Sequence, residues 1–259
     1  MLHPVHSAML VAALLAQNPQ QPAPAIDATC PEIAAALQAV VRNDVRLRDW
    51  PQLARYRDQN SALAAPAPNE ARVVFMGDSI TDIWQQPRFG FFVPEKPYVD
   101  RGISGQTTPQ MLVRFRPDVI DLKPKVVVIL AGTNDIAGNT GPMTNEEIEG
   151  NIQSMTELAK AHGIKVVLAS ITPTSAYHAA PTAAPQTSLR PMNRIKAINA
   201  WMKSYADRNG YIYLDYFTPM LDATGVMKAE LTNDDLHPNA DGYKIMAPLV
   251  EAAIQRALR

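Results

Sequence analysis

Short apolar runs alternate with longer amphipathic stretches from residue 73 to the C-terminus. The runs Val73–Met76, Val126–Leu130 and Val166–Ala169 contain only apolar side chains, which is typical of strands covered on both faces of a parallel sheet. Two shorter runs predict further strands at Tyr98–Asp100 and Tyr211–Leu214. The pattern therefore indicates a sheet of buried, parallel strands.

The stretches between these strands carry apolar residues at helical spacing. Thr144 and Glu147 have the spacing of a capping box, and Thr108–Pro109 and Pro238 are predicted to begin two further helices. The predicted core stripes are Met111, Leu112 and Phe115; Ile148, Ile152, Met155 and Ala159; Met192, Ile195, Ile198, Met202 and Tyr205; and Tyr243, Met246, Val250 and Ile254. Strands that alternate with helices favour right-handed crossovers and two helical layers, a flavodoxin-like three-layer α/β sandwich.

The first 70 residues have a different pattern. Within residues 1–25, the apolar segment Ala8–Ala16 is too short to span a bilayer but has the length of a signal-peptide core. We therefore expect a periplasmic or secreted protein, and keep a cytoplasmic location as the alternative because no Lys or Arg precedes the segment. Residues 26–70 are predicted to form a helical extension, broken near Pro51, with a linker, and residues 71–259 the main domain.

Composition narrows the class of partner. The net charge is −1 with Lys and Arg scattered, so the chain lacks the basic surface of nucleic-acid or membrane-surface proteins, and we expect a small neutral or polar substrate. Cys30 is the only cysteine, which excludes an intrachain disulfide and a cysteine-based metal site. A lipid anchor at Cys30 is disfavoured by Asp27 and Thr29. Nothing in the sequence defines the oligomeric state.

Four polar stretches follow or end predicted elements. They are Gly77–Ser79, Arg101–Gly105, Ala131–Asp135 and Asp234–Pro238. Ligands of open α/β sheets bind at the carboxyl ends of the strands, so we expect these stretches to meet at one edge. The first alone would equally fit an ordinary helix cap.

In this order and spacing, the four stretches resemble the SGNH (GDSL-type) hydrolases, a family of serine ester hydrolases. The resemblance runs from about residue 73 to the C-terminus and implies a five-stranded parallel sheet. The second stretch departs from the family pattern at Asp100 and Gln106, where the family often has Asn and Asp. The residues that correspond to the family's name are Ser79, Gly105, Asn134 and His237.

Ester cleavage through a serine needs a base, a carboxylate that orients the base, and donors for the oxyanion. We predict Ser79 as the nucleophile, His237 as the base and Asp234 as the carboxylate, because a carboxylate three residues before a histidine can reach one ring nitrogen. The resemblance implies an oxyanion hole from the backbone N–H groups of Ser79 and Gly105 and the amide of Asn134. No metal or cofactor is expected.

Three carboxylates beside these motifs are predicted to be structural. Asp78 and Asp135 would order their loops. Asp235 would face away from the histidine, because successive side chains of an extended loop point to opposite sides.

Two further regions are candidates for substrate contact. Residues 172–190 form a long irregular stretch after a strand, so Tyr177, His178 and Arg190 are predicted to contact substrate. An acyl wall or a core edge is predicted for the apolar residues Phe89, Phe91, Phe92 and Val93.

These residues predict a serine esterase that releases short acyl groups, most simply acetyl, from carbohydrates or small alcohols through an acyl-enzyme. A lysophospholipase or acyl-thioesterase of the same family is the alternative. A metallophosphoesterase needs more well-placed histidines than this chain offers. The absence of a Gly-x-Ser-x-Gly motif excludes an ordinary α/β-hydrolase, and the intact motif set disfavours a non-catalytic carbohydrate-binding protein.

Overall fold

The computed structural model describes residues 35, 37–41 and 47–259. The chain divides into two compact units, residues 1–48 and 49–259. In the first unit, the described residues 35 and 37–41 are helical. The predicted export segment and Cys30 lie outside the described residues. No helix in the described ranges is long and apolar enough to cross a membrane.

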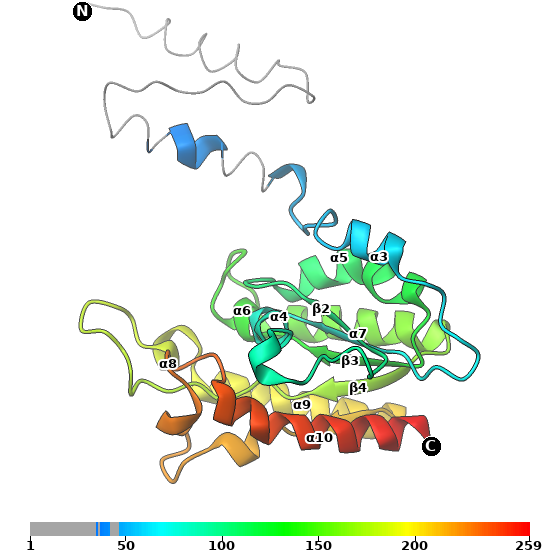
Figure 1. The fold of residues 1–259 in the computed structure, drawn as a ribbon. Helices are drawn as coiled ribbons and strands as arrows, with labels where there is room; N and C mark the ends of the chain where they lie inside the picture. Colours follow the sequence, from blue (N-terminus) through cyan, green and yellow to red (C-terminus); the bar gives the residue numbers. More distant parts are fainter. Residues whose placement is uncertain (1–34, 36, 42–46) are drawn as a thin grey trace, which may run out of the picture. The chain divides into compact units, whose positions relative to one another are not determined.

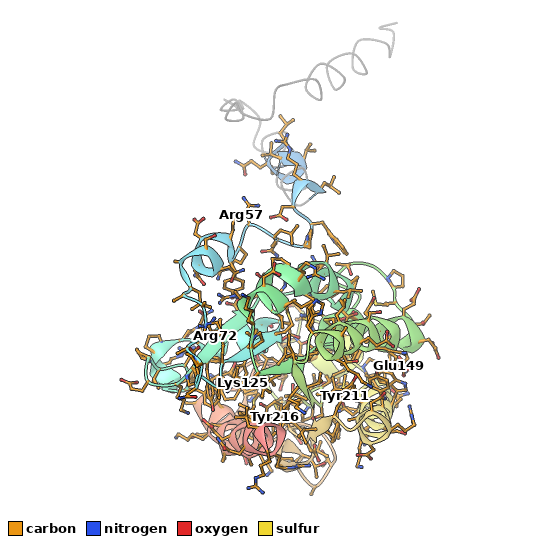
Figure 2. All side chains as sticks on the ribbon, turned by 90° about the vertical axis from the view of Figure 1, so that its right-hand side faces the viewer. Arg57, Arg72, Lys125, Glu149, Tyr211 and Tyr216 are labelled. Atoms are coloured by element: carbon orange, nitrogen blue, oxygen red, sulfur yellow. The ribbon has the colours of Figure 1, made fainter. Side chains whose placement is uncertain are left out.

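The second unit is built on a five-stranded sheet with the order β2-β1-β3-β4-β5, and all pairs are parallel. The strands are β1 (Val73–Gly77), β2 (Tyr98–Gly102), β3 (Val126–Leu130), β4 (Lys165–Ala169) and β5 (Ile212–Leu214). Figure 2 shows Arg72, Lys125 and Tyr211, which directly precede β1, β3 and β5, at the amino-terminal edge of the sheet. All the motifs of the sequence analysis therefore gather at the opposite edge.

Side chains alternate between the two faces of the sheet. In β1, Val74 and Met76 enter the core beneath α5, α7 and α9, whereas Val73 and Phe75 enter the core beneath α4 and α10 (Figure 1). The α-helices of this unit are α3 (Arg57–Ala62), α4 (Ser79–Trp84), α5 (Thr108–Asp118), α6 (Thr133–Ile136), α7 (Asn145–Ala161), α8 (Gln186–Leu189), α9 (Met192–Asn209) and α10 (Ala240–Leu258). Short 3₁₀ turns are η1 (Pro87–Phe89), η2 (Ile120–Leu122), η3 (Thr218–Met220) and η4 (Ala229–Leu231). The predicted three-layer fold and parallel sheet are confirmed.

Helix starts follow their capping residues. The box at the start of α7 forms as predicted, with the Glu147 N–H donating to Thr144 Oγ1 at 3.2 Å and the Thr144 N–H to Glu147 at 2.7 Å. The last helix begins at Ala240 and not at Pro238, because Asn239 caps it by accepting from the N–H groups of residues 241 and 242. Before α3, Leu53 lies in turns and not in the predicted helix.

Residues 49–62 pack against the sheet domain. The Tyr56 ring is 1% exposed, and its hydroxyl donates to the carbonyl of Gly102 at the end of β2. The Asn60 amide donates to Asp118 of α5 at 2.7 Å, and the Gln110 amide of the same helix donates to the carbonyl of Trp50 at 2.7 Å. This part of the predicted extension therefore belongs to the same compact unit as the strands.

Candidate active site

Ser79 lies at the junction between strand β1, an interior strand of the sheet, and helix α4. Asp78 caps α4 by accepting from the N–H of Ile80 at 2.9 Å, so Ser79 is the first residue of the helix and is 8% exposed. Burial raises the pKa of Asp78 to about 6, against the hydrogen bond from Ile80. Asp78 thus orders the turn, in line with its predicted structural role.

The structure brings Ser79 together with the histidine of the last motif. His237 Nε2 lies 2.8 Å from Ser79 Oγ, and His237 Nδ1 lies 2.6 Å from Asp234 Oδ2. The carboxylate can only accept, so Nδ1 carries the ring proton and Nε2 is free to accept from the serine hydroxyl. This arrangement allows a proton to move from the serine to the imidazole.

Asp234 is itself held by its own loop. Its Oδ1 accepts from the N–H groups of Leu236 at 3.1 Å and His237 at 2.8 Å, and from the Thr232 hydroxyl at 3.2 Å. Burial alone would raise the pKa of Asp234, but the hydrogen bonds from His237 outweigh it and the pKa lies below its ordinary value. The carboxylate is therefore ionised at neutral pH and stabilises an imidazolium beside it.

Three potential oxyanion donors come from three different elements. The Ser79 N–H is at the start of α4, where helix N–H groups lack partners within the helix, and Gly105 lies in the loop after β2. Gly105 has φ +81°, a left-handed conformation that glycine adopts without strain. Within the described residues, no acceptor contacts the N–H of either residue. Asn134 lies in α6, directly after β3, and is 3% exposed.

Arg190 is buried in contact with Asn134 and does not lie at the rim of the active site, where it was predicted to contact substrate. It is 5% exposed, and its Nη2 donates to Asn134 Oδ1 at 3.2 Å. The Asn134 amide nitrogen donates to the carbonyl of Gln106 at 3.0 Å. Burial lowers the pKa of Arg190, against the field of Asp78 and Asp234. No local sequence pattern indicates this pairing.

Tyr177 and His178 are anchored to the loop of the histidine. Their N–H groups donate to Asp235 at 2.9 and 2.8 Å, and the Ser175 hydroxyl donates to the same carboxylate at 2.5 Å. The Tyr177 hydroxyl donates to Asp222 at 2.6 Å. Tyr177 and His178 are both exposed. Asp235 is 1% exposed, and the hydrogen bonds that it accepts direct its carboxylate away from His237, as predicted, and tie residues 175–178 to the catalytic loop. Its backbone is left-handed, with φ +68°, and not extended as the prediction assumed.

A buried arginine links the Ser79 turn to the Gly105 loop. Arg114 of α5 is 0% exposed and donates to the carbonyl of Gly77 at 3.0 Å and to the side chain of Gln106. Its charge is paired with Asp118 at 3.0 Å. Sequence reasoning missed this role, because the spacing of Arg114 is simply that of a helix residue. Gln106 points into the protein, where its amide also donates to Pro51.

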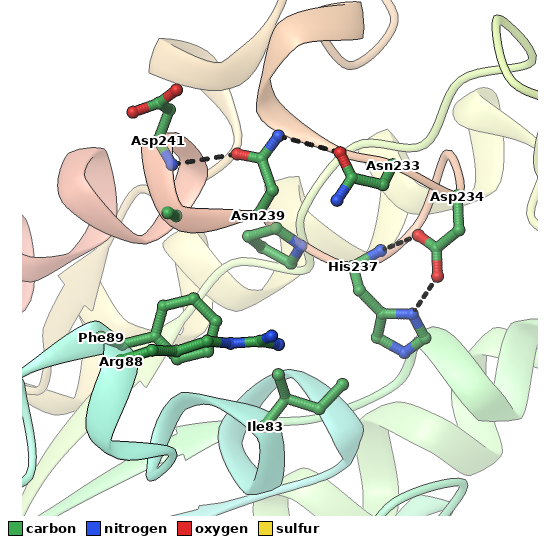
Figure 3. Close-up of a pocket in the computed structure, with 10 residues that line it drawn as sticks. Ile83, Arg88, Phe89, Asn233, Asp234, His237, Asn239 and Asp241 are labelled. Carbon is green, nitrogen blue, oxygen red and sulfur yellow. Dashed lines mark hydrogen bonds and ion pairs between the residues drawn. The ribbon is translucent and has the colours of Figure 1, made fainter.

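A pocket of about 500 Å³ opens beside His237 (Figure 3). Six of its ten lining residues are polar or charged, and Figure 3 shows Arg88 and Phe89 facing Asn239 across it. The Arg88 guanidinium lies over the Phe89 ring at 4.7 Å. The residues that line the pocket are Ile83, Arg88, Phe89, Asn233, Asp234, His237, Pro238, Asn239, Ala240 and Asp241.

The remaining predicted carboxylate, Asp135, has a structural position. Its Oδ1 accepts from the N–H of Thr108 at 2.9 Å and from the Thr108 hydroxyl, so it connects α6 to α5. Burial raises its pKa, against these hydrogen bonds. In the part of the chain that the structure describes, no group of three His, Cys, Asp or Glu side chains has the arrangement of a metal site.

A serine whose hydroxyl faces a carboxylate-oriented imidazole, next to N–H donors for an oxyanion, is equipped for acyl transfer, the chemistry of serine hydrolases. Residues 75–245 match the model of the GDSL-like lipase/acylhydrolase family. The match covers more than half of the chain, so the chain belongs to this family and is an ester hydrolase.

Relatives of this chain agree with that membership. It is similar to a GDSL-like lipase from Bacteroides thetaiotaomicron, with 42% identity, a TM-score of 0.73, and coverage of 80% of this chain and 98% of the other. The α2 subunit of platelet-activating factor acetylhydrolase IB from Rattus norvegicus is 26% identical over 72% of this chain and 77% of its own. A lipoprotein of Bacillus subtilis, YqeF, is 37% identical over 78 residues. The matched segment is 29% of this chain and only 32% of the length of YqeF.

Proposed function

We propose that this esterase releases short acyl groups, acetyl above all, from carbohydrates or other small polar alcohols. The observation that carries the proposal is the polar pocket beside His237 (Figure 3). A leaving alcohol takes its proton from the base, so its remaining atoms lie on the His237 side. Amide, carboxylate and guanidinium groups there match hydroxyl groups on the alcohol.

In this mechanism, Ser79 Oγ bonds to the acyl carbon while His237 Nε2 takes the hydroxyl proton. The carbonyl electron pair moves onto oxygen, which accepts from the N–H groups of Ser79 and Gly105 and the amide of Asn134. The ester C–O bond then breaks, and the alcohol oxygen takes the proton from Nε2. Water repeats the sequence on the acyl-enzyme and returns the free acid. The distances of 2.8 Å and 2.6 Å along the triad support these roles.

The aromatic residues near the site favour a short acyl group. Phe91 is 4% exposed and stacks on Trp84 with ring centroids 4.2 Å apart, and Phe92 lies 5.0 Å from Phe75. Phe91 and Phe92 therefore pack at the edge of the core. Of the four residues predicted as an acyl wall, only Phe89 lines the pocket beside His237, so these residues offer little apolar surface for a long acyl chain. The name of the rat relative, an acetylhydrolase subunit, also supports acetyl.

Initial rates on aryl esters from acetyl to palmitoyl, with acetylated saccharides and lysophospholipid alongside, test the acyl preference. We expect the acetyl esters to react fastest and the rate to fall with each longer chain. Rates on octanoyl or longer esters above the acetyl rate would assign the protein to the lysophospholipase or thioesterase alternative.

The chemistry of the nucleophile has its own test. Ser79→Ala should give a folded, inactive protein, and a phosphonate should label Ser79 in the unaltered protein. Hydrolysis of an acetyl ester should persist after dialysis against EDTA. Loss of activity that manganese or zinc restores would instead favour a metallophosphoesterase.

The pocket can be tested separately through Arg88. Arg88→Met should raise KM for an acetylated saccharide by roughly threefold or more, the loss of about one hydrogen bond, and leave 4-nitrophenyl acetate within twofold. Arg116→Met on the exposed face of α5, where the arginine is 58% exposed, is the matched control. Equal effects of Arg88→Met on both substrates would remove the pocket from alcohol recognition.

A further inference from the structure

The side-chain amide of Asn134 is held from both ends. Its nitrogen donates to the carbonyl of Gln106 at 3.0 Å, and its oxygen accepts from Arg190 Nη2 at 3.2 Å. An amide nitrogen carries two hydrogens, so one N–H remains after the bond to Gln106. That remaining N–H is the one that can donate to a substrate oxyanion.

Arg190 is held as firmly as the amide it contacts. Its Nε donates to the carbonyl of Thr133 at 3.1 Å and to the Thr133 hydroxyl at 3.0 Å, and its Nη1 donates to Gln186. Together with Asn134 Oδ1, these acceptors make four. The guanidinium, with 5% exposure of the residue, is therefore fixed in place, and it does not line the pocket beside His237. Three of its five N–H groups therefore donate to protein acceptors, the kind of pairing that a buried cation needs.

We propose that Arg190 is a positioning residue that orients and polarises the Asn134 amide as an oxyanion donor, an inference that rests on the proposed esterase function. A flipped amide would place its NH₂ group against the guanidinium and its oxygen against the carbonyl of Gln106, so both contacts would become repulsive. The cation therefore selects one orientation. Because the amide oxygen accepts from a charged donor, its N–H groups become stronger donors.

The shape of the guanidinium explains why an arginine is needed at this position. One planar group contacts Thr133, Asn134 and Gln186 at once, and so fixes two successive residues of α6 to the first residue of α8. A lysine ammonium is a single point of charge and cannot hold all three acceptors in one plane. Arg190→Lys should therefore retain only part of the effect.

The first measurement is the steady-state kinetics of Arg190→Met on an acetyl ester. We expect kcat to fall by about 30-fold, less than the roughly 100-fold loss of an oxyanion donor, with KM within twofold. Arg190→Lys should give an intermediate kcat. Arg194→Met is the matched control, because Arg194 donates to Asn145 at 2.8 Å and to the carbonyls of Met143 and Ile136. It therefore contacts α6 without contacting Asn134, and its kcat should stay within twofold.

A double-mutant cycle separates positioning from a purely structural role. If Arg190 acts through Asn134, Arg190→Met and Arg190→Lys should each lower kcat by less than threefold in the Asn134→Ala background. The same fold-loss in both backgrounds would overturn the inference. Thermal unfolding of every variant shows which of them are folded. If Arg190→Met does not fold, the cycle is carried out with Arg190→Lys. An inactive unaltered protein would instead contradict the proposed function.

Discussion

The loop Thr232–His237 and the loop Ile103–Gln106 both lie at the carboxyl edge of the sheet, but different contacts hold them. Asp234 in the first loop is bound by residues no more than three positions away, namely Thr232, Leu236 and His237. The second loop is fixed by partners distant in sequence. Its Gln106 contacts Arg114, Asn134 and Pro51, and the last of these is 55 residues away.

This difference separates the chemistry of the site from its support. The base and its carboxylate come from one short loop, so their geometry depends on few other residues. The oxyanion donors come from three elements, and their geometry depends on buried charged groups, Arg114 at 0% and Arg190 at 5% exposure. Substitutions of Asp234 and His237 should therefore act on the reaction directly, and those around the second loop should give smaller, graded losses.

The largest effect is expected for Asp234→Asn. The amide cannot stabilise the imidazolium and favours the wrong tautomer of His237, so kcat on an acetyl ester should fall by as much as ~10⁴ while the fold is kept. The measurement is kcat together with circular dichroism. A loss below tenfold would show that another group orients the histidine.

The oxyanion side should respond less strongly. Asn134→Ala removes one donor, so kcat should fall by roughly 10²-fold with little change in KM. Asn193→Ala, an exposed site on α9, is the matched control and should keep its activity. A kcat of Asn134→Ala equal to that of the control would make Asn134 a loop residue only.

The same contrast decides how much could be predicted from the sequence. The bounds of β3 and the start of α7 follow from a continuous β-branched run and a capping box, both of which are local signals. The pairing of Asp234 with His237 also follows from a local signal, because the two residues are three positions apart in the chain. Where two local signals compete, prediction is less accurate: Asn239 displaced the expected helix start at Pro238 by two residues.

The supporting residues carry no local signal. Arg190 contacts Asn134 across 56 residues of sequence, and Arg114 contacts Gly77 across 37. Only the tertiary fold brings these pairs together, and an arginine in a long Pro-rich segment has the same sequence pattern whether it faces substrate or the interior. The adjacent residues Asp234 and Asp235 illustrate this limit. The alternation of side chains predicts that their carboxylates point in different directions, but it does not predict that Asp235 binds residues 175–178.

Asp235→Asn should affect stability more than catalysis. Its two oxygens accept from the Ser175 hydroxyl and from the N–H groups of Tyr177 and His178, so an amide leaves at least one buried donor without an acceptor. We expect the free energy of unfolding to fall by about 2 kcal/mol, or the melting temperature by roughly 5 °C, while kcat changes less than threefold. A loss of kcat equal to that of Asp234→Asn would show that the triad is assigned wrongly.

The smallest effect on the reaction is expected at Asp100, below the second loop. Its Oδ1 accepts from the N–H of Gly102 at 2.8 Å, and within the described residues its buried Oδ2 has no partner. Burial raises the pKa of Asp100 to about 7, with Asp82 adding to the rise and Arg101 and Arg114 opposing it. The unfolded carboxyl ionises near pH 4, so the folded state binds an extra proton between about pH 4 and 7, and the stability from Asp100 is lost as the pH rises through this window.

Asp100→Asn removes this titration and keeps the oxygen that binds Gly102. Relative to the unaltered protein, the variant should therefore gain about 2 kcal/mol of unfolding free energy between pH 5 and pH 8, because each pH unit in which the folded carboxyl holds a proton and the unfolded one does not is worth about 1.4 kcal/mol. The partner that the new NH₂ group lacks costs the same at both pH values. Asp78, whose pKa burial also raises, contributes equally to both proteins and cancels in the comparison. Denaturant unfolding at both pH values measures the difference. A difference that stays constant from pH 5 to pH 8 would show that Asp100 is ionised throughout, and kcat should change by less than twofold in either case.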